Sequence, residues 1–157
     1  MTSVTLRLKW CAAHRLLHHR GKCVGLHGHN FHADITVTAN YAALTITGMV
    51  IDFAAVKGVV GKWIDDNWDH RPILNKDDSL LKADGGGRWL SPEELTERFG
   101  VRPFVMDCEP TAENMARFLF DFPWFPPPSP TTPYRVTKVT VWETDTCSAT
   151  HGHEVPR

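Results

Sequence analysis

A cysteine and two histidines within one seven-residue stretch suggest a metal beside a reactive thiol. The stretch begins at Cys23 and places the imidazoles at His27 and His29. Histidines two residues apart in an extended segment point to the same side of a strand, so both rings can reach one ion. The spacing therefore predicts two ligands of a metal site, and a third ligand must come from elsewhere in the chain.

The hydrophobic pattern near the N-terminus indicates His14 as the third ligand. Between Val4 and His14 apolar residues occupy every second position, which is typical of a half-buried strand. A second run, from His27 to Ala39, alternates in the same way and carries His27 and His29 on its apolar face. Chance alone would have to place all three histidines on apolar faces, where polar side chains are uncommon. Five of the other histidines are interpreted as ordinary polar residues: His18, His19, His32, His151 and His153.

Three neutral imidazoles with an open fourth position are the ligand set expected of catalytic zinc. Structural zinc sites are usually closed by four protein ligands and are richer in cysteine. Cys23 could supply the fourth ligand. We favour a free thiol at this position, because a zinc-bound thiolate would close the site and because a carboxylate and a histidine farther along the chain suggest acid–base chemistry.

The composition indicates one domain, residues 1–157, with no global attraction for polyanions. The chain is long enough to bury a core, at 157 residues and 17.7 kDa. Its formal net charge of −1 disfavours nucleic acid or an anionic membrane as a partner. Without a signal-like or membrane-length apolar stretch, the protein is expected in the cytoplasm. The four cysteines are irregularly spaced, so reduced thiols are expected instead of disulfides.

Two helices are predicted in the middle of the chain. Asp52 can cap the first, and the second begins near Thr111, directly after a proline. Apolar residues recur at helical spacing in the first helix, at Phe53, Val56, Val60, Trp63 and Ile64. The second helix is expected to bury a stripe of Met115, Phe118, Leu119 and Phe122. An inserted segment at about 76–109 separates them, and a capping box at Ser91 predicts a short extra helix there.

Two further strands are expected after a proline-rich connector at 123–133, which excludes regular structure. One begins near Val136 and places Glu143 at the end of an apolar face, and a short one runs from about Cys147 to His151. The order strand, strand, helix, helix, strand, strand favours an α+β fold, with a four-stranded antiparallel sheet covered on one face by two helices.

Six motifs occur in order along most of the chain. They are Ala12-Ala13-His14, Cys23-x3-His27-Gly28-His29, Gly48-Met49-Val50-Ile51-Asp52-Phe53, Asp69-His70, Pro110-Thr111-x-Glu113-Asn114 and Val139-x-Val141-x-Glu143-Thr144. Together they resemble the 6-pyruvoyltetrahydropterin synthase / 6-carboxytetrahydropterin synthase family. The resemblance implies the tunnelling fold (T-fold), in which the sheets of several subunits join edge to edge into a barrel. A homo-oligomer, either a hexamer or a tetramer with active sites at subunit interfaces, is therefore expected.

The resemblance also implies which residues perform the chemistry. The residues that match the family's zinc ligands are His14, His27 and His29. Cys23 matches the catalytic base, and Asp69 with His70 matches the pair that completes its proton relay. Zinc bound to the side-chain oxygens of a dihydropterin triphosphate would make the neighbouring C–H more acidic, so that a thiolate at Cys23 could remove the proton.

Three more residues match positions around the pterin. Glu143 matches the carboxylate that holds the ring and is sometimes counted in the relay. A carboxylate suits this role because the ring edge presents adjacent N–H donors that it can accept in parallel. Thr111 matches a residue that lines the pterin pocket, and Glu113 matches a motif position near it.

One spacing distinguishes the members of the family. Three residues separate Cys23 from His27, which resembles the bacterial 6-carboxytetrahydropterin synthases of 7-deazaguanine (queuosine) biosynthesis. We therefore expect a zinc-dependent lyase that converts 7,8-dihydroneopterin triphosphate into 6-carboxy-5,6,7,8-tetrahydropterin, with release of triphosphate and acetaldehyde. The alternative product is 6-pyruvoyltetrahydropterin. An alternative of another class is a non-catalytic, zinc-stabilised pterin-binding or assembly subunit, which would have no need of a base and a relay.

The loop before Cys23 concentrates positive charge in a nearly neutral protein. A triphosphate needs compensating charge, and cations beside Cys23 would raise the fraction of thiolate. We therefore expect Arg20 and Lys22 to bind the phosphates, from the same chain or from a neighbouring subunit.

Overall fold

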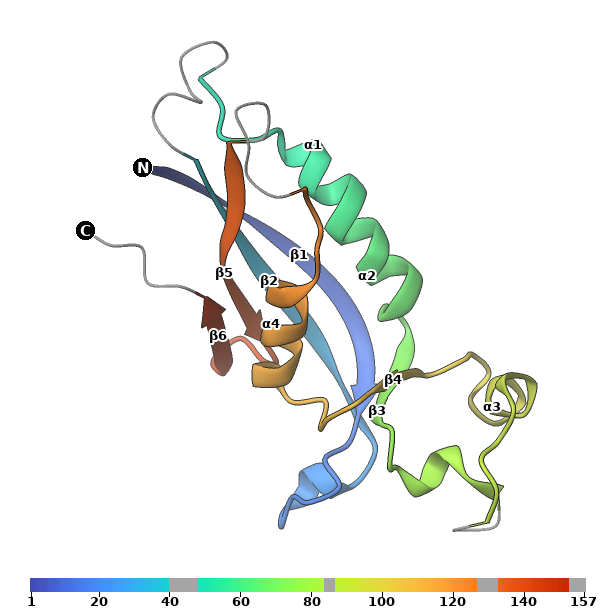
Figure 1. Ribbon diagram of the computed structural model, residues 1–157. Helices are drawn as coiled ribbons and strands as arrows, with labels where there is room; N and C mark the ends of the chain where they lie inside the picture. The colour runs from blue at the N-terminus through green and yellow to red at the C-terminus, as the bar shows by residue number, and fades with distance from the viewer. Residues whose placement is uncertain (40–47, 84–86, 127–132, 153–157) are drawn as a thin grey trace.

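Two long antiparallel strands, β1 (Thr2–His14) and β2 (His27–Ala39), form the centre of the protein (Figure 1). They pair along their whole length, from Thr2 opposite Ala39 to His14 opposite His27. The computed structural model describes residues 1–39, 48–83, 87–126 and 133–152. Strand β5 (Tyr134–Trp142) pairs antiparallel with β2, and β6 (Ser148–Gly152) pairs antiparallel with β5. These four strands confirm the predicted antiparallel sheet.

The sheet has six strands, not the predicted four. Two short strands, β3 (Arg71–Asn75) and β4 (Phe104–Met106), extend it beyond β1 and give the order β4-β3-β1-β2-β5-β6. Both additions are parallel to their neighbours. The prediction missed them because both segments are short and neither alternates apolar with polar residues. In β3 all but the first residue are buried, as is common for a parallel strand.

Helices cover one face of the sheet, as predicted (Figure 1). The first is capped by Asp52, which accepts a hydrogen bond from Ala54 N at 2.8 Å. It continues through α1 (Phe53–Val56), a π-helical turn η3 (Lys57–Gly61) and α2 (Lys62–Asn67). The other is α4 (Ala112–Asp121), capped by Thr111. None of the helices in the described ranges is long and apolar enough to cross a membrane.

The core lies between these helices and the apolar face of the sheet. It combines alternate residues of β1 and β2 with helix residues such as Val60, Ile64, Met115 and Leu119, which are all fully buried. The prediction that Phe122 is buried on the apolar face of α4 was wrong. Phe122 comes after the last turn of α4 and is 37% exposed, although its ring stacks on that of Trp124.

The inserted segment has its own small core at the end of the sheet. It contains η4 (Ser79–Leu81) and the predicted extra helix α3 (Pro92–Phe99), whose capping box at Ser91 and Glu94 is formed. Its buried residues are Leu74, Leu81 and Leu95. Part of this segment (84–86) and most of the proline-rich connector (127–132) lie outside the described residues.

Candidate metal and catalytic site

Three histidines meet where β1 ends and β2 begins. The register places His14 opposite His27 and Ala12 opposite His29, so all three imidazoles project from the helix-covered face at one end of the sheet. Their ring centroids lie between 4.6 and 5.2 Å apart. The structure therefore brings together the three residues that the sequence predicts as metal ligands.

Glu143 completes this cluster. It follows β5 directly, and its Oε1 atom lies 3.1 Å from His14 Nε2 and 3.7 Å from His29 Nε2. One ligand atom from each of the three histidines and from Glu143 lies within 4.8 Å of all the others. Cys23 does not belong to this group of ligand atoms, which agrees with a thiol that is free of the metal.

Backbone carbonyls orient two of the imidazoles. His14 Nδ1 lies 2.7 Å from the Pro110 carbonyl oxygen, and His27 Nδ1 lies 2.8 Å from that of Gly25. A carbonyl can only accept, so each Nδ1 must carry the proton and each Nε2 keeps a free lone pair. These two rings are therefore held in the tautomer that a metal requires.

The surroundings keep two of the imidazoles neutral. Burial lowers the pKa of His14, against the opposing effects of the Pro110 carbonyl and Glu143, and the neighbouring histidines lower it further. Burial likewise lowers the pKa of His29, with His27 adding to the effect and Glu143 opposing it. Neutral imidazole is the form that binds a metal.

The donor set fits a metal ion. The Nε2 atoms of His14, His27 and His29 are all buried and form no hydrogen bond within the described part of the chain. Buried polar atoms normally have a partner, so three of them converging on one point indicate that a cation belongs there. Nitrogen ligands from three histidines with one carboxylate oxygen are a combination that zinc accepts.

Cys23 lines a pocket beside this cluster. It lies in a 3₁₀ turn, η1 (Lys22–Val24), and its side chain is half-buried. The pocket has a volume of about 290 Å³ and includes three further residues that the sequence predicts for the site, Thr111, Glu113 and Glu143. Glu143 thus belongs both to the pocket and to the metal cluster. The pocket lining also includes His19 and Cys147, for which the sequence predicts no role in the site.

Asp69 and His70 form the predicted pair, and both contact the backbone of Cys11 in β1. His70 Nδ1 lies 2.8 Å from Asp69 Oδ2, and Cys11 N donates to Asp69 Oδ1 at 2.9 Å. Burial opposes the ionisation of Asp69, but the hydrogen bonds from Cys11 and His70 outweigh it and hold the pKa of Asp69 below its usual value. His70 adopts a left-handed backbone conformation with φ of 56°, and its N–H donates to Cys11 O at 2.7 Å.

Cys23 and His70 line different pockets of the chain. His70 lies in a larger pocket, of about 530 Å³, together with His29, Arg71 and Phe99 of the inserted segment. Within one chain the predicted base and its predicted relay partner therefore do not share a pocket. Arg20 and Lys22 are exposed on the loop before Cys23 and line neither pocket.

Solved structures share the whole architecture of this chain. An uncharacterised protein of Wolinella succinogenes superposes with a TM-score of 0.73 at 21% identity, covering 98% of each chain. The 6-pyruvoyl tetrahydropterin synthase of Plasmodium falciparum gives a TM-score of 0.67 at 18% identity, covering 99% of this chain and 100% of that one. The protein is thus a tunnelling-fold protein, as predicted.

Sequence similarity identifies the protein family within this fold. Residues 3–154 match the 6-pyruvoyl tetrahydropterin synthase family, to which this chain therefore belongs. The 6-carboxy-5,6,7,8-tetrahydropterin synthase of Rickettsia conorii is 34% identical over 147 residues, which cover 94% of this chain and 97% of that protein. The enzyme of the same name from Haemophilus influenzae is 30% identical over 122 residues, covering 77% and 81%.

Removing one imidazole should remove the metal. We expect purified protein to carry about one metal ion per chain and His29→Ala to lose it, because two histidines and a carboxylate bind far more weakly than the complete set. Elemental analysis by mass spectrometry measures this content. His32→Ala is the matched control, since His32 lies on β2 but on the opposite face, and it should keep its metal. A metal-loaded His29→Ala protein would contradict the assignment.

Proposed function

We propose that the protein is a zinc-dependent 6-carboxy-5,6,7,8-tetrahydropterin synthase. Its substrate would be 7,8-dihydroneopterin triphosphate, and the reaction would release triphosphate and acetaldehyde. The observation that carries this proposal is the pocket that Cys23 and Glu143 both line, because the Glu143 carboxylate also contacts the histidine cluster. A thiol base, a carboxylate and a metal site thus lie within reach of one small molecule.

Each residue of this pocket has a distinct task. Zinc, held by His14, His27 and His29, would supply Lewis acidity toward the side-chain oxygens of the substrate. Cys23, as the thiolate, takes the proton from the adjacent carbon. Thr111 fixes the start of α4 at the pocket wall, because its hydroxyl accepts from Asn114 N at 3.3 Å. The half-buried position of Cys23 limits access of water to the thiolate.

Glu143 receives the pterin ring in this proposal. The N–H donors along the ring edge match the two oxygens of one carboxylate. Its contact with His14 adds a second constraint, since Oε1 lies 3.1 Å from Nε2. We propose that Glu143 turns toward the ring when substrate binds, so that His14, His27 and His29 would hold the metal and leave room beside it for the substrate oxygens.

The second half of the relay comes from another copy of the chain in this proposal. Asp69 orients His70 through the 2.8 Å contact, and His70 then moves protons on the face of the substrate opposite Cys23. The separation of the Cys23 and His70 pockets supports an active site at a subunit interface of a homo-oligomer. The sheet ends in β4 on one side and β6 on the other, and edge-to-edge pairing would protect such strands. Arg20 and Lys22, exposed beside Cys23, are then available to the triphosphate.

Two findings favour the 6-carboxy product and the 7-deazaguanine (queuosine) pathway. The three-residue spacing between Cys23 and His27 resembles the enzymes of that pathway. The relatives that match most of this chain also carry the 6-carboxytetrahydropterin name. The mass of the product distinguishes the 6-carboxy from the 6-pyruvoyl compound.

Turnover and metal content should separate at Cys23. We expect the purified protein to convert 7,8-dihydroneopterin triphosphate into 6-carboxy-5,6,7,8-tetrahydropterin, identified by mass. Cys23→Ala should keep its metal yet turn over about 100- to 10,000-fold more slowly, because it lacks the base. Cys108→Ala, a change of thiol outside the pocket, serves as the control. If Cys23→Ala loses metal as fully as His29→Ala, Cys23 is a ligand and this mechanism is wrong.

The role of Glu143 can be tested by removing its charge. We expect Glu143→Gln to weaken substrate binding by about 1.5–3 kcal/mol, the contribution of a charged hydrogen bond, while metal content is unchanged. Calorimetric titration with the substrate and elemental analysis measure the two quantities. Loss of metal with unchanged pterin affinity would instead make Glu143 the fourth metal ligand.

An interface active site predicts complementation between two inactive variants. Cys23→Ala and His70→Ala should each be inactive alone, but co-expression should restore about one quarter of wild-type activity. Random assembly leaves both residues intact in that share of sites when each comes from a different subunit. Activity per subunit of the mixed oligomer is the measurement. No recovery in a verified mixed oligomer would place the complete site within one chain.

A further inference from the structure

The loop that carries Cys23 (residues 15–23, the Cys23 loop) is attached through three consecutive residues. Leu16 N donates to the carbonyl oxygen of Cys23 at 2.8 Å, which closes the loop on itself. The residue before it, Arg15, donates from Nε and Nη2 to the two carboxylate oxygens of Asp78, at 2.7 and 2.5 Å. Leu16, which contacts Cys23, therefore follows directly after Arg15, whose position is fixed by Asp78 outside the loop.

Asp78 is a firm anchor. Its side chain is completely buried, whereas that of Arg15 is 18% exposed. Asp78 Oδ1 also accepts from Leu80 N at 2.7 Å, which ties it to the turn η4, and Arg15 donates to Ser79 Oγ at 3.1 Å. A two-point pairing between arginine and carboxylate fixes orientation as well as distance.

Glu109 anchors the residue on the other side of Leu16. Leu17 N donates to Glu109 Oε2 at 3.0 Å. The carbonyl oxygen of Glu109 accepts from Thr111 N at 2.8 Å and from Asn114 Nδ2 at 2.9 Å. Glu109 is therefore fixed to the start of α4, whose first residues also line the Cys23 pocket.

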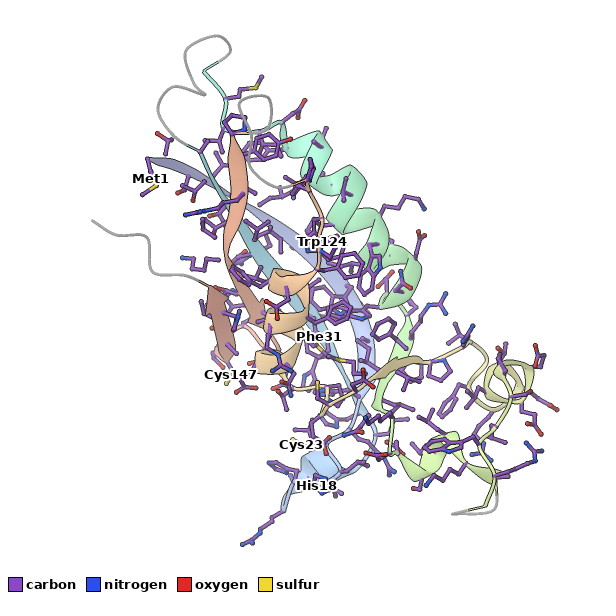
Figure 2. All side chains as sticks on the ribbon, in the orientation of Figure 1. Met1, His18, Cys23, Phe31, Trp124 and Cys147 are labelled. Carbon is purple, nitrogen blue, oxygen red and sulfur yellow. The ribbon has the colours of Figure 1, made fainter. Side chains whose placement is uncertain are left out.

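We propose that Asp78 and Glu109, one near each end of the inserted segment, are positioning residues that hold Cys23 in its pocket. This inference rests on the proposed function, because it concerns the placement of the base for that reaction. Figure 2 shows Cys23 and His18 on a loop beyond the ends of β1 and β2, away from the core around Phe31. Loops move more than strands, and a displacement of about 1 Å can cost about 100-fold in rate, so the base needs such support.

The position of Cys23 can be measured without any turnover. Iodoacetamide alkylates thiolates, and peptide mass spectrometry follows each of the four cysteines separately. We expect Cys23 to react severalfold faster in Glu109→Ala, because the released loop exposes a thiol that is half-buried. Cys11, which is already exposed and lies outside the Cys23 pocket, should react at its wild-type rate and serve as the internal reference.

Kinetics on 7,8-dihydroneopterin triphosphate give the second measurement. We expect Glu109→Ala to lower kcat about 10- to 100-fold while KM and metal content stay near wild type. Glu109→Gln keeps an oxygen that accepts from Leu17 and should recover most of the kcat. Glu97→Ala removes an exposed carboxylate from α3 of the same segment and is the control. Asp78→Asn, which weakens the pairing with Arg15, should shift Cys23 alkylation in the same direction if its circular dichroism shows a folded protein.

Several outcomes would overturn the proposal. Wild-type alkylation and kcat in Glu109→Ala would show that the loop needs no anchor there. Loss of metal in Glu109→Ala would show that Glu109 acts on His14 through Pro110 and not on Cys23. Equal impairment in the Gln and Ala variants would show that the hydrogen bond to Leu17 is not the cause. If the wild-type protein fails to convert the pterin, the proposed function fails, but the alkylation of Cys23 still decides whether Glu109 positions it.

Discussion

The register between β1 and β2 is the constraint on which the rest of the site depends. Because side chains alternate along a strand, a slip of one residue would move His27 and His29 to the polar face and leave His14 alone in the core. The same alternation buries Trp10 and Phe31, whose rings stack at 5.4 Å. Burial of large apolar residues on one face therefore sets the register, and the register places the ligands. The metal site follows from hydrophobic packing before any ion binds.

This preorganisation leaves polar atoms without partners in the absence of a cation. Three imidazole nitrogens are buried with no hydrogen bond in the described part of the chain. Each such atom costs about 1–3 kcal/mol, so an ion that binds all of them stabilises the folded protein. The carbonyls of Pro110 and Gly25 prepare His14 and His27 for a metal ion, since they fix the tautomers that keep each Nε2 lone pair free. Metal affinity and the stability of the strand ends are consequently coupled.

Sequence patterns predicted those parts of the molecule in which periodicity or a cap carries the information. The two long strands, the helix capped by Asp52, the capping box at Ser91 and the histidine cluster all belong to this group. Strands β3 and β4 were missed, because segments of five and three residues are too short to show a hydrophobic period. The proximity of Glu143 to His14 was also missed, since it arises from the pairing of β5 with β2 across more than one hundred residues of sequence. The placement of Cys23 and His70 in different pockets is likewise a property of tertiary structure alone.

The site combines ligands on rigid strands with a base on a loop, and these two parts need different support. Backbone ladders hold the main chain of His14, His27 and His29, and the carbonyls of Pro110 and Gly25 orient two of the rings. Cys23, in contrast, lies in the short turn η1, and its carbonyl oxygen accepts a hydrogen bond from Leu16 N. A chain with just the sheet and two helices would leave that loop free to move, as loops ordinarily do. The inserted segment supplies two carboxylates where this freedom would matter most, which gives a physical reason for a length that the sheet and its helices do not require.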